Sequence, residues 1–302
     1  MRLSRMLMAV GCWLLLWPAS GTAAAVEVFA GIAPQAYLVK RIGGDLAQVH
    51  TLLPPGRDPH TFEPTPGQVM ALGRARIYFS TDLPFERILL GKIRAGRDSL
   101  TVIDTTAGIN KLPMPEEHEH GHDHAPGSAA SHHEEELDPH VWLAPPLLKS
   151  MAEQVLAGLL ALPGLTPEQA ASCRRNHAAL VRELDQLHGQ LAAQLTPLAG
   201  QTFYVYHAAF GYFADTYGLR QEGVETGGKA PTPKQLLALI NNAKEDGVRV
   251  IFVQPQFDRK SAVSVARAIN GRVVPLDPLA EDVIANLREM AAQISAALGV
   301  AP

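Results

Sequence analysis

Residues 166–195 read TPEQAASCRRNHAALVRELDQLHGQLAAQL; after Pro167 this run contains no further proline and only one glycine. A threonine followed by a proline is a typical helix start, with Thr166 as the N-cap and Pro167 at the first helical position. Leucines recur at steps of three and four residues, which places them on one helical face: Leu180, Leu184, Leu187, Leu191 and Leu195. About 30 residues would span roughly 45 Å, more than one small lobe requires. We therefore expect a rigid strut between two lobes, although an ordinary long core helix would show the same pattern.

Short apolar segments alternate with helical patterns on both sides of this helix. Strands are expected at 26–32, 48–53, 76–80, 100–104, 202–206, 248–254 and 272–276. Helices are expected at 33–42, 65–75, 84–95, 145–162, 208–217, 232–246, 259–269 and 281–298, while residues 222–230 are glycine-rich and are typical of a loop. The alternation predicts an α/β protein whose mainly parallel sheets are flanked by helices. We expect an N-terminal lobe over 26–163, a linking helix over 164–198 and a C-terminal lobe over 199–302.

Composition sets broad limits on function. Of the 302 residues, 47% are apolar and 19% are charged, so the chain can bury a sizeable core. The formal net charge is −4, and no basic cluster occurs beyond the N-terminus. Nucleic-acid binding would require a face rich in lysine and arginine, so we expect no nucleic-acid partner.

The first 25 residues have the pattern of a secretory signal peptide. Arg2 and Arg5 precede the apolar run 6–17, and small residues then lead to an Ala-x-Ala site that ends at Ala25. The apolar run is too short for a stable transmembrane helix. We expect cleavage after Ala25 and a periplasmic product; a retained membrane anchor is the alternative.

The chain contains two cysteines, Cys12 near the N-terminus and Cys173 in the long helical run. Cys12 weakly resembles the lipidation site of a bacterial lipoprotein, but the apolar residues 13–17 follow it, whereas a lipidated cysteine should follow the apolar run. The mature chain then keeps only Cys173, so an intramolecular disulfide is excluded. We interpret Cys173 as a structural thiol.

Residues 116–136 read EEHEHGHDHAPGSAASHHEEE and contain almost no apolar side chains. Such a segment cannot bury a core, so we expect a mobile loop. Its six histidines alternate with acids: His118, His120, His122, His124, His132 and His133. Imidazole is the commonest protein ligand for divalent transition metals, so the segment is expected to collect such ions weakly. A merely solvated, charged loop is the alternative.

Four further residues follow apolar stretches in the manner of ligands at strand ends: His60, His140, His207 and Asp277. His60 and His140 each close an Asp-Pro-His tripeptide, and proline stiffens the loop that presents the side chain. Ligands of open α/β sheets bind beyond the carboxyl ends of the strands, so the four could meet between two lobes. Three imidazoles and a carboxylate suit tetrahedral Zn²⁺. His50, His177 and His188 lack this context.

These motifs resemble one known family throughout the mature chain. The matching segments are LPPGRDPH (53–60) with FEP (62–64), DPHVWL (138–143), YHAAF (206–210) with YGL (217–219), PTPKQL (231–236), VQPQF (253–257) and LDPL (276–279). The chain resembles the zinc-binding periplasmic components of bacterial high-affinity ABC transporters, the ZnuA-like members of the TroA-like family. The resemblance implies two α/β lobes joined by one long helix, with metal bound in the interlobe cleft by His60, His140, His207 and Asp277. Manganese members tend to carry glutamate where His207 stands, which favours zinc.

Two features depart from the family pattern: the histidine-rich loop is of modest length, and the single mature cysteine excludes a disulfide that some members have. The resemblance implies a monomeric carrier, not an enzyme, that passes Zn²⁺ to an inner-membrane ABC permease with its ATPase. A periplasmic zinc donor is a possible additional partner.

Two other functions stay open at this point. The first is a manganese or iron carrier on the same fold. The second is a secreted zinc hydrolase, against which the chain lacks an H-E-x-x-H motif and offers Asp277 for the position that a catalytic water needs. Glu63 or Glu225 could act as the general base of such an enzyme, but their spacing selects neither.

Overall fold

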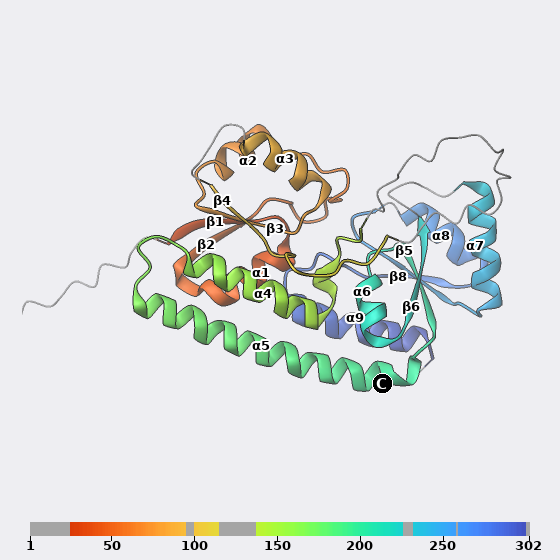
Figure 1. The fold of residues 1–302 in the computed structure, drawn as a ribbon. Helices are drawn as coiled ribbons and strands as arrows, with labels where there is room; N and C mark the ends of the chain where they lie inside the picture. Colours follow the sequence, from red (N-terminus) through yellow and green to blue (C-terminus); the bar gives the residue numbers. More distant parts are fainter. Residues whose placement is uncertain (1–24, 95–99, 115–136, 226–231, 258, 300–302) are drawn as a thin grey trace, which may run out of the picture.

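The computed structural model describes residues 25–94, 100–114, 137–225, 232–257 and 259–299. Two four-stranded sheets lie side by side (Figure 1). The first contains β1 (Val26–Ala30), β2 (Ala47–Thr51), β3 (Ile77–Ser80) and β4 (Thr101–Asp104). The second contains β5 (Thr202–His207), β6 (Arg220–Glu225), β7 (Val250–Val253) and β8 (Arg272–Pro275).

Both sheets are wholly parallel and share one topology. Their strand orders are β2-β1-β3-β4 and β6-β5-β7-β8, so the second half of the described chain repeats the winding of the first. All strands of a parallel sheet end at the same edge, and the loops beyond that edge can bring residues from different strands together. The predicted fold class, two α/β lobes with mainly parallel sheets, is confirmed.

Helices cover the sheets and connect the lobes. They are α1 (Ala33–Gly43), α2 (Pro66–Leu72), α3 (Pro84–Arg94), α4 (Pro145–Leu160), α5 (Pro167–Leu195), α6 (Gly211–Tyr217), α7 (Pro233–Glu245), α8 (Arg259–Ala268) and α9 (Val283–Ala297). Short 3₁₀ helices occupy Gly44–Leu46, Val141–Leu143 and Thr196–Leu198. In the part of the chain that the structure covers, no helix combines the length and the apolar character needed to cross a bilayer.

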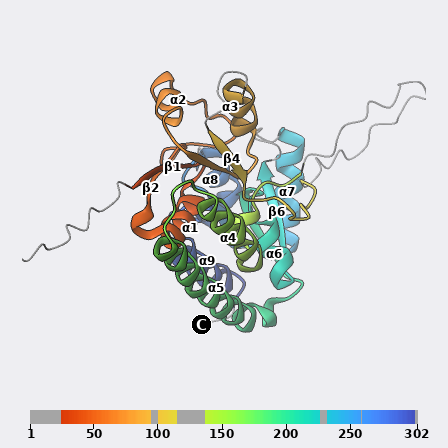
Figure 2. The same ribbon diagram turned by 60° about the vertical axis from the view of Figure 1, so that its left-hand side comes forward.

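The long helix predicted from the sequence is α5. Thr166 caps it, because its side chain accepts a hydrogen bond from the Gln169 amide while the Gln169 side chain reaches back to the Thr166 backbone. Figures 1 and 2 show α5 running along one side of the molecule, beside α1, α4 and α9. All five leucines of the predicted stripe are buried.

Helix α5 is nevertheless not a lone strut between separate cores. One continuous cluster of buried apolar side chains includes Phe79 of the first sheet, Leu184 of α5, Phe252 of the second sheet and Leu287 of α9. A second, smaller cluster lies around Tyr204, Ile251 and Leu239 of the second lobe. The apolar cores of the two lobes are therefore continuous with one another along α5, which resists large rigid-body movement between them.

The structure corrects one sequence-based assignment. Residues 220–225 form β6, although a loop was expected from residue 222. The strand RQEGVE has little of the apolar alternation that marks a half-buried strand, because β6 lies at the edge of its sheet and pairs only with β5. Residues 1–24 and 115–136 lie outside the described residues, and with them almost all of the expected signal peptide and the histidine-rich segment.

Candidate metal centre

Three of the four predicted ligands meet in the structure. One nitrogen from each of His60, His140 and His207 lies within 4.8 Å of the other two, and this is the only such group of three or more histidine, cysteine, aspartate or glutamate side chains in the described ranges. The Nε2 atoms of His60 and His207 are 3.1 Å apart. The ring centroids of the three imidazoles are separated by 4.8 to 5.8 Å.

Two of the three histidines are presented by the same local turn. Asp58 Oδ1 accepts a hydrogen bond of 2.9 Å from the backbone N–H of His60, and Asp138 Oδ1 accepts one of 2.9 Å from the backbone N–H of His140. In both cases the aspartate side chain closes a turn over the intervening proline. This turn is the physical reason for the repeated Asp-Pro-His tripeptide. His207 is the last residue of β5.

Buried carboxylates fix the rings of His140 and His207. The Nδ1 atom of His140 lies 2.6 Å from Asp138 Oδ1, and the Nδ1 atom of His207 bonds to Glu225 Oε1. Asp138 and Glu225 are only 1% and 3% exposed. An imidazole that donates its Nδ1 proton to a carboxylate keeps Nε2 free as a metal ligand.

Sequence reasoning missed the role of Glu225. It belongs to β6, where it pairs in register with His207 of β5. The available signal was that His207 and Glu225 are polar residues at the ends of two neighbouring strands. That signal appears only once β6 is recognised as a strand.

The surroundings of His60 lower the pKa of its imidazole. Burial, together with the nearby His207 and His140 rings, lowers the pKa of His60 to about 4. At neutral pH the His60 ring is therefore uncharged, which is the form that binds a metal ion.

The three histidines line a small cavity with mostly apolar walls. Its lining residues are Pro59, His60, His140, Trp142, His207, Gln256, Phe257, Pro278 and Leu279. The space open to the centre of a water-sized sphere is about 10 Å³, close to the roughly 10–15 Å³ that one water molecule needs. Phe257 packs on His207 and Trp142 on His140, with centroid distances of 5.0 and 5.4 Å. The cavity therefore has room for about one particle of the size of a water molecule or a metal ion.

Asp277, the fourth residue predicted, is not part of the three-histidine group. Its Oδ1 accepts hydrogen bonds from the backbone N–H of Leu279 at 2.9 Å and from Gln256 Nε2 at 2.8 Å. The bond to Leu279 makes the same aspartate-proline turn as in the two Asp-Pro-His tripeptides. Here the residue after the proline is Leu279, and it is this leucine, not Asp277, that lines the cavity.

The remaining histidines and the cysteine lie apart from the cavity. His50 lies 2.5 Å from Glu27, His177 lies 3.3 Å from Glu153, and His188 contacts the Tyr217 hydroxyl at 3.4 Å. Cys173 is buried, and burial raises the pKa of its thiol, which disfavours the reactive thiolate. The six histidines of the histidine-rich segment fall outside the described residues.

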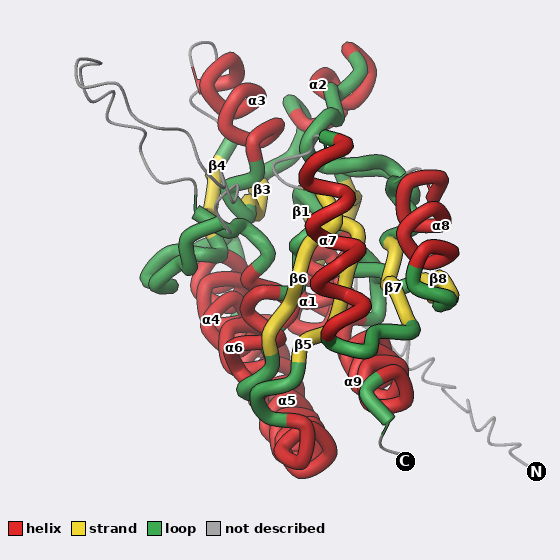
Figure 3. The backbone as a smooth tube through the Cα atoms, turned by 90° about the vertical axis from the view of Figure 1, so that its right-hand side faces the viewer, coloured by secondary structure: helices red, strands yellow, loops and turns green. Residues whose placement is uncertain are grey.

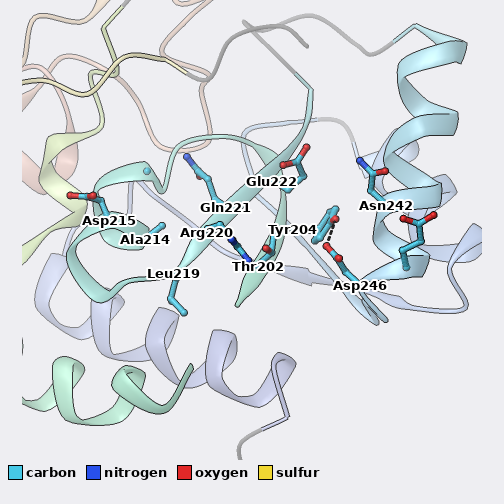
Figure 4. Close-up of a pocket in the computed structure, with 12 residues that line it drawn as sticks. Thr202, Tyr204, Ala214, Asp215, Leu219, Arg220, Gln221, Glu222, Asn242 and Asp246 are labelled. Carbon is cyan, nitrogen blue, oxygen red and sulfur yellow. Dashed lines mark hydrogen bonds between the residues drawn. The ribbon is translucent and has the colours of Figure 1, made fainter. Parts of the chain in front are cut away.

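A larger pocket of about 560 Å³ opens on the second lobe, along β5, β6, α6 and α7 (Figure 4). Polar side chains are spread around it, and the Tyr204 hydroxyl donates a 2.8 Å hydrogen bond to Asp246 Oδ2. None of its lining residues belongs to the three-histidine group. The candidate metal centre is therefore the small cavity.

The fold and this cavity together define a metal-binding protein of the two-lobed α/β class. Residues 28–297 match the family described as "Zinc-uptake complex component A periplasmic". The chain belongs to this family, whose members are periplasmic components of zinc-uptake systems.

Individual relatives agree with this assignment. The chain is 26% identical to the high-affinity zinc uptake system protein ZnuA of Yersinia pestis, over 86% of this chain and 85% of that protein. A crystal structure of ZnuA is 35% identical and superposes with a TM-score of 0.81, covering 91% of this chain and 100% of the other. The periplasmic zinc-binding protein TroA from Treponema pallidum, at 20% identity and a TM-score of 0.75 over 91% of this chain and 99% of that one, has the same fold.

Proposed function

We propose that this protein captures Zn²⁺ with His60, His140 and His207 and delivers it to an ABC permease in the inner membrane. The convergence of three Nε2 atoms, two of them oriented by buried carboxylates, carries this proposal. Two nitrogens about 2.0–2.1 Å from one tetrahedral zinc ion lie roughly 3.3 Å apart. The 3.1 Å between the Nε2 atoms of His60 and His207 is close to that spacing.

Zinc suits the site better than manganese. Three imidazole nitrogens favour Zn²⁺, whereas Mn²⁺ prefers a shell richer in oxygen. A manganese or iron carrier is the second candidate, and metal competition would separate the two. The family assignment also disfavours a hydrolase, because the family's members are components of a zinc-uptake complex.

Asp277 stays our proposed fourth protein ligand from the sequence. Its Oδ1 is already engaged by Leu279 and Gln256, so ligation would use its other oxygen and a small shift of the turn toward the histidines. The variant Asp277→Ala tests this proposal. Weakened zinc binding and an added water on the ion would support it, and unchanged affinity with another fourth ligand would exclude it.

We further propose that residues 116–136 collect zinc weakly for the cavity. The chain on either side of this segment supports the proposal: Pro113 pairs with Leu137 in an antiparallel bridge. The Tyr212 hydroxyl accepts a bond of 2.9 Å from the Leu112 N–H and donates one of 2.8 Å to the Asp138 carbonyl. The described chain on either side of the segment therefore lies beside the turn that presents His140.

The wider assignment follows from the family and the sequence. We propose a monomer that leaves the cytoplasm by a signal peptide cleaved after Ala25, that serves a permease coupled to an ATPase, and that accepts zinc from a periplasmic donor. We also propose lobes over 26–163 and 199–302 with a linking helix over 164–198.

Calorimetric titration of zinc into the His207→Ala variant tests the central assignment. We expect loss of the tight binding event, because the remaining ligands cannot enclose the ion. The matched control is His188→Ala, since His188 lies on α5 away from the cavity and should keep the event. Equal zinc affinity in the two variants would move the metal centre elsewhere.

A further inference from the structure

Gln256 is the one side chain of the cavity wall, besides the three imidazoles, that carries an oxygen able to ligate a metal. The other lining residues are prolines, Phe257 and Leu279, which have no donor group, and Trp142, whose Nε1–H donates to the Pro278 carbonyl at 2.7 Å. Asp277 does not line the cavity. Any oxygen that a small ion meets from a side chain of this wall therefore belongs to Gln256.

The hydrogen bonds of Gln256 decide which end of its amide is uncommitted. Nε2 donates to Asp277 Oδ1 at 2.8 Å, and a carboxylate accepts only from the N–H₂ end of the amide. The Oε1 atom is therefore the uncommitted end of the amide. It is buried and has no hydrogen-bond partner among the described residues.

A buried acceptor without a partner requires an explanation, and a bound ion or water is one of them. Leaving such a group unsatisfied costs about 1–3 kcal/mol, and native proteins rarely tolerate it without a reason. Gln256 lines the cavity together with the three histidines, so an ion bound there is a candidate partner for this oxygen.

We propose that Gln256 Oε1 is an oxygen donor to the zinc ion held by His60, His140 and His207. Asp277 is then a positioning residue at least in part, because it holds the amide through Nε2 and fixes which end faces the ion. This inference rests on the proposed zinc-binding function and adds a residue to its site. A neutral amide oxygen is a weaker donor than a carboxylate, which suits a carrier that must release its ion.

Zinc affinity, measured by competition with a chromophoric chelator, tests the inference on two variants and a control. Gln256→Leu removes the oxygen and keeps much of the volume, whereas Gln256→Glu keeps an oxygen but removes the N–H₂ group that Asp277 accepts from. The matched control is Gln293→Leu: Gln293 Oε1 is also buried without a partner, but Gln293 lies on α9 and does not line the cavity. Thermal unfolding without zinc verifies that each variant folds.

We expect Gln256→Leu to lower zinc affinity at least about tenfold, the lower end of the range for loss of a residue that supports a metal site. Gln256→Glu should bind more tightly than Gln256→Leu, and Gln293→Leu should match the wild type. Wild-type affinity in Gln256→Leu would overturn the inference and leave the three-histidine site intact. Equally weak binding by the Leu and Glu variants would also overturn it, because the bond to Asp277 and not the oxygen would then matter. A wild-type protein without a tight zinc site would instead refute the proposed function.

Discussion

At the scale of single residues, Asp138 and Glu225 determine how the histidines can act. Each is buried and receives the Nδ1 side of one ring, so Nε2 of His140 and of His207 faces the cavity. Gly211 allows this arrangement, because a Cβ atom there would lie 2.9 Å from Asp138 Oδ2. The site thus has two layers of residues, the imidazoles and the carboxylates that orient them. Both layers depend on particular side chains.

The first prediction concerns the outer layer. Asp138→Ala removes the acceptor of both the His140 ring and its backbone N–H, so the ring loses its fixed orientation. We expect zinc affinity to fall about 10–100-fold, measured by chelator competition. Asp215→Ala is the control, since Asp215 is exposed on α6. An Asp138→Ala protein that binds zinc like the control would contradict the two-layer account.

The sequence predicted the histidines better than their carboxylate partners. Each Asp-Pro-His tripeptide marks its own turn, so His60 and His140 can be found from neighbouring residues alone. The contact between Glu225 and His207 depends on strand pairing, which no local pattern encodes. The position of Asp277 also depends on a distant group, Gln256, and for that reason spacing could not predict it.

Glu86 is a buried carboxyl group away from the metal centre. Its oxygens accept hydrogen bonds from the Tyr78 hydroxyl at 2.6 Å and from the backbone N–H groups of Thr81 and Leu83 at 3.0 and 2.8 Å. Gly31 leaves room for it, because a Cβ atom there would lie 2.1 Å from Glu86 Oε1. Burial raises the pKa of Glu86 from 4.5 to about 6, despite these bonds.

The second prediction is the pH dependence of stability that follows from this shift. The raised pKa means that the folded state favours protonated Glu86, so the stabilising contribution is complete below pH 4.5 and is lost as pH rises through about 6. The loss amounts to about 2 kcal/mol for a shift of this size. Urea unfolding of the metal-free protein should show this decrease, and Glu86→Gln should lack it. An identical pH profile in the two proteins would refute the assignment.

At the scale of elements, α5 and β6 show what sequence periodicity can and cannot reveal. The α5 pattern is strong because its leucines face a core along the whole helix, and the Thr166 cap fixes its start. The pattern of β6 is weak because only one of its edges is paired and its side chains are largely polar. The sequence therefore predicted the helix within a residue and missed the strand.

The third prediction concerns the single glycine of α5. Gly189 is exposed, and a Cβ atom there would meet nothing within 4 Å. Gly189→Ala should raise the free energy of unfolding by roughly 0.5–1 kcal/mol, because alanine loses less backbone entropy in a helix. Gly158→Ala in α4 is the contrasting control, since its Cβ would lie 2.8 Å from Phe79. Denaturant titration should give opposite signs for the two, and a destabilised Gly189→Ala would contradict the packing described for α5.

At the scale of the whole molecule, two lobes of equal topology have apolar cores that join along α5, and residues of both lobes form the candidate metal centre. Figure 3 shows the second sheet with α7 and α8, and α5 and α9 along its lower end. The turn that carries His140 is tied to the second lobe twice, by the Tyr212 hydroxyl on the Asp138 carbonyl and by Trp142 Nε1 on the Pro278 carbonyl. We therefore expect only small lobe movements on metal binding. The sequence suggested two lobes. It did not predict that their cores join, because this depends on packing between residues far apart in the chain, which periodicity does not report.

The fourth prediction concerns the histidine-rich segment. Deleting 116–136 should leave one tight zinc site per protein and remove the weaker binding events in calorimetry. Weak sites on a segment without its own core lose chain entropy on binding, so they should be weaker than the prearranged cavity. They should also lose zinc first on acidification, because imidazoles must be neutral to bind zinc, protonate near pH 6.5 when unperturbed, and compete less well with protons where they bind the ion weakly. Survival of every weak event after deletion would show that the segment is not a collector.

The central claim is that one zinc ion binds among His60, His140 and His207. Anomalous diffraction at the zinc absorption edge, from crystals of the zinc-loaded protein, tests it most directly. The account predicts one strong peak about 2.0–2.1 Å from the Nε2 atom of each of the three imidazoles. A principal peak outside bonding distance of at least one of these three rings would contradict it, as would strong peaks only at other residues.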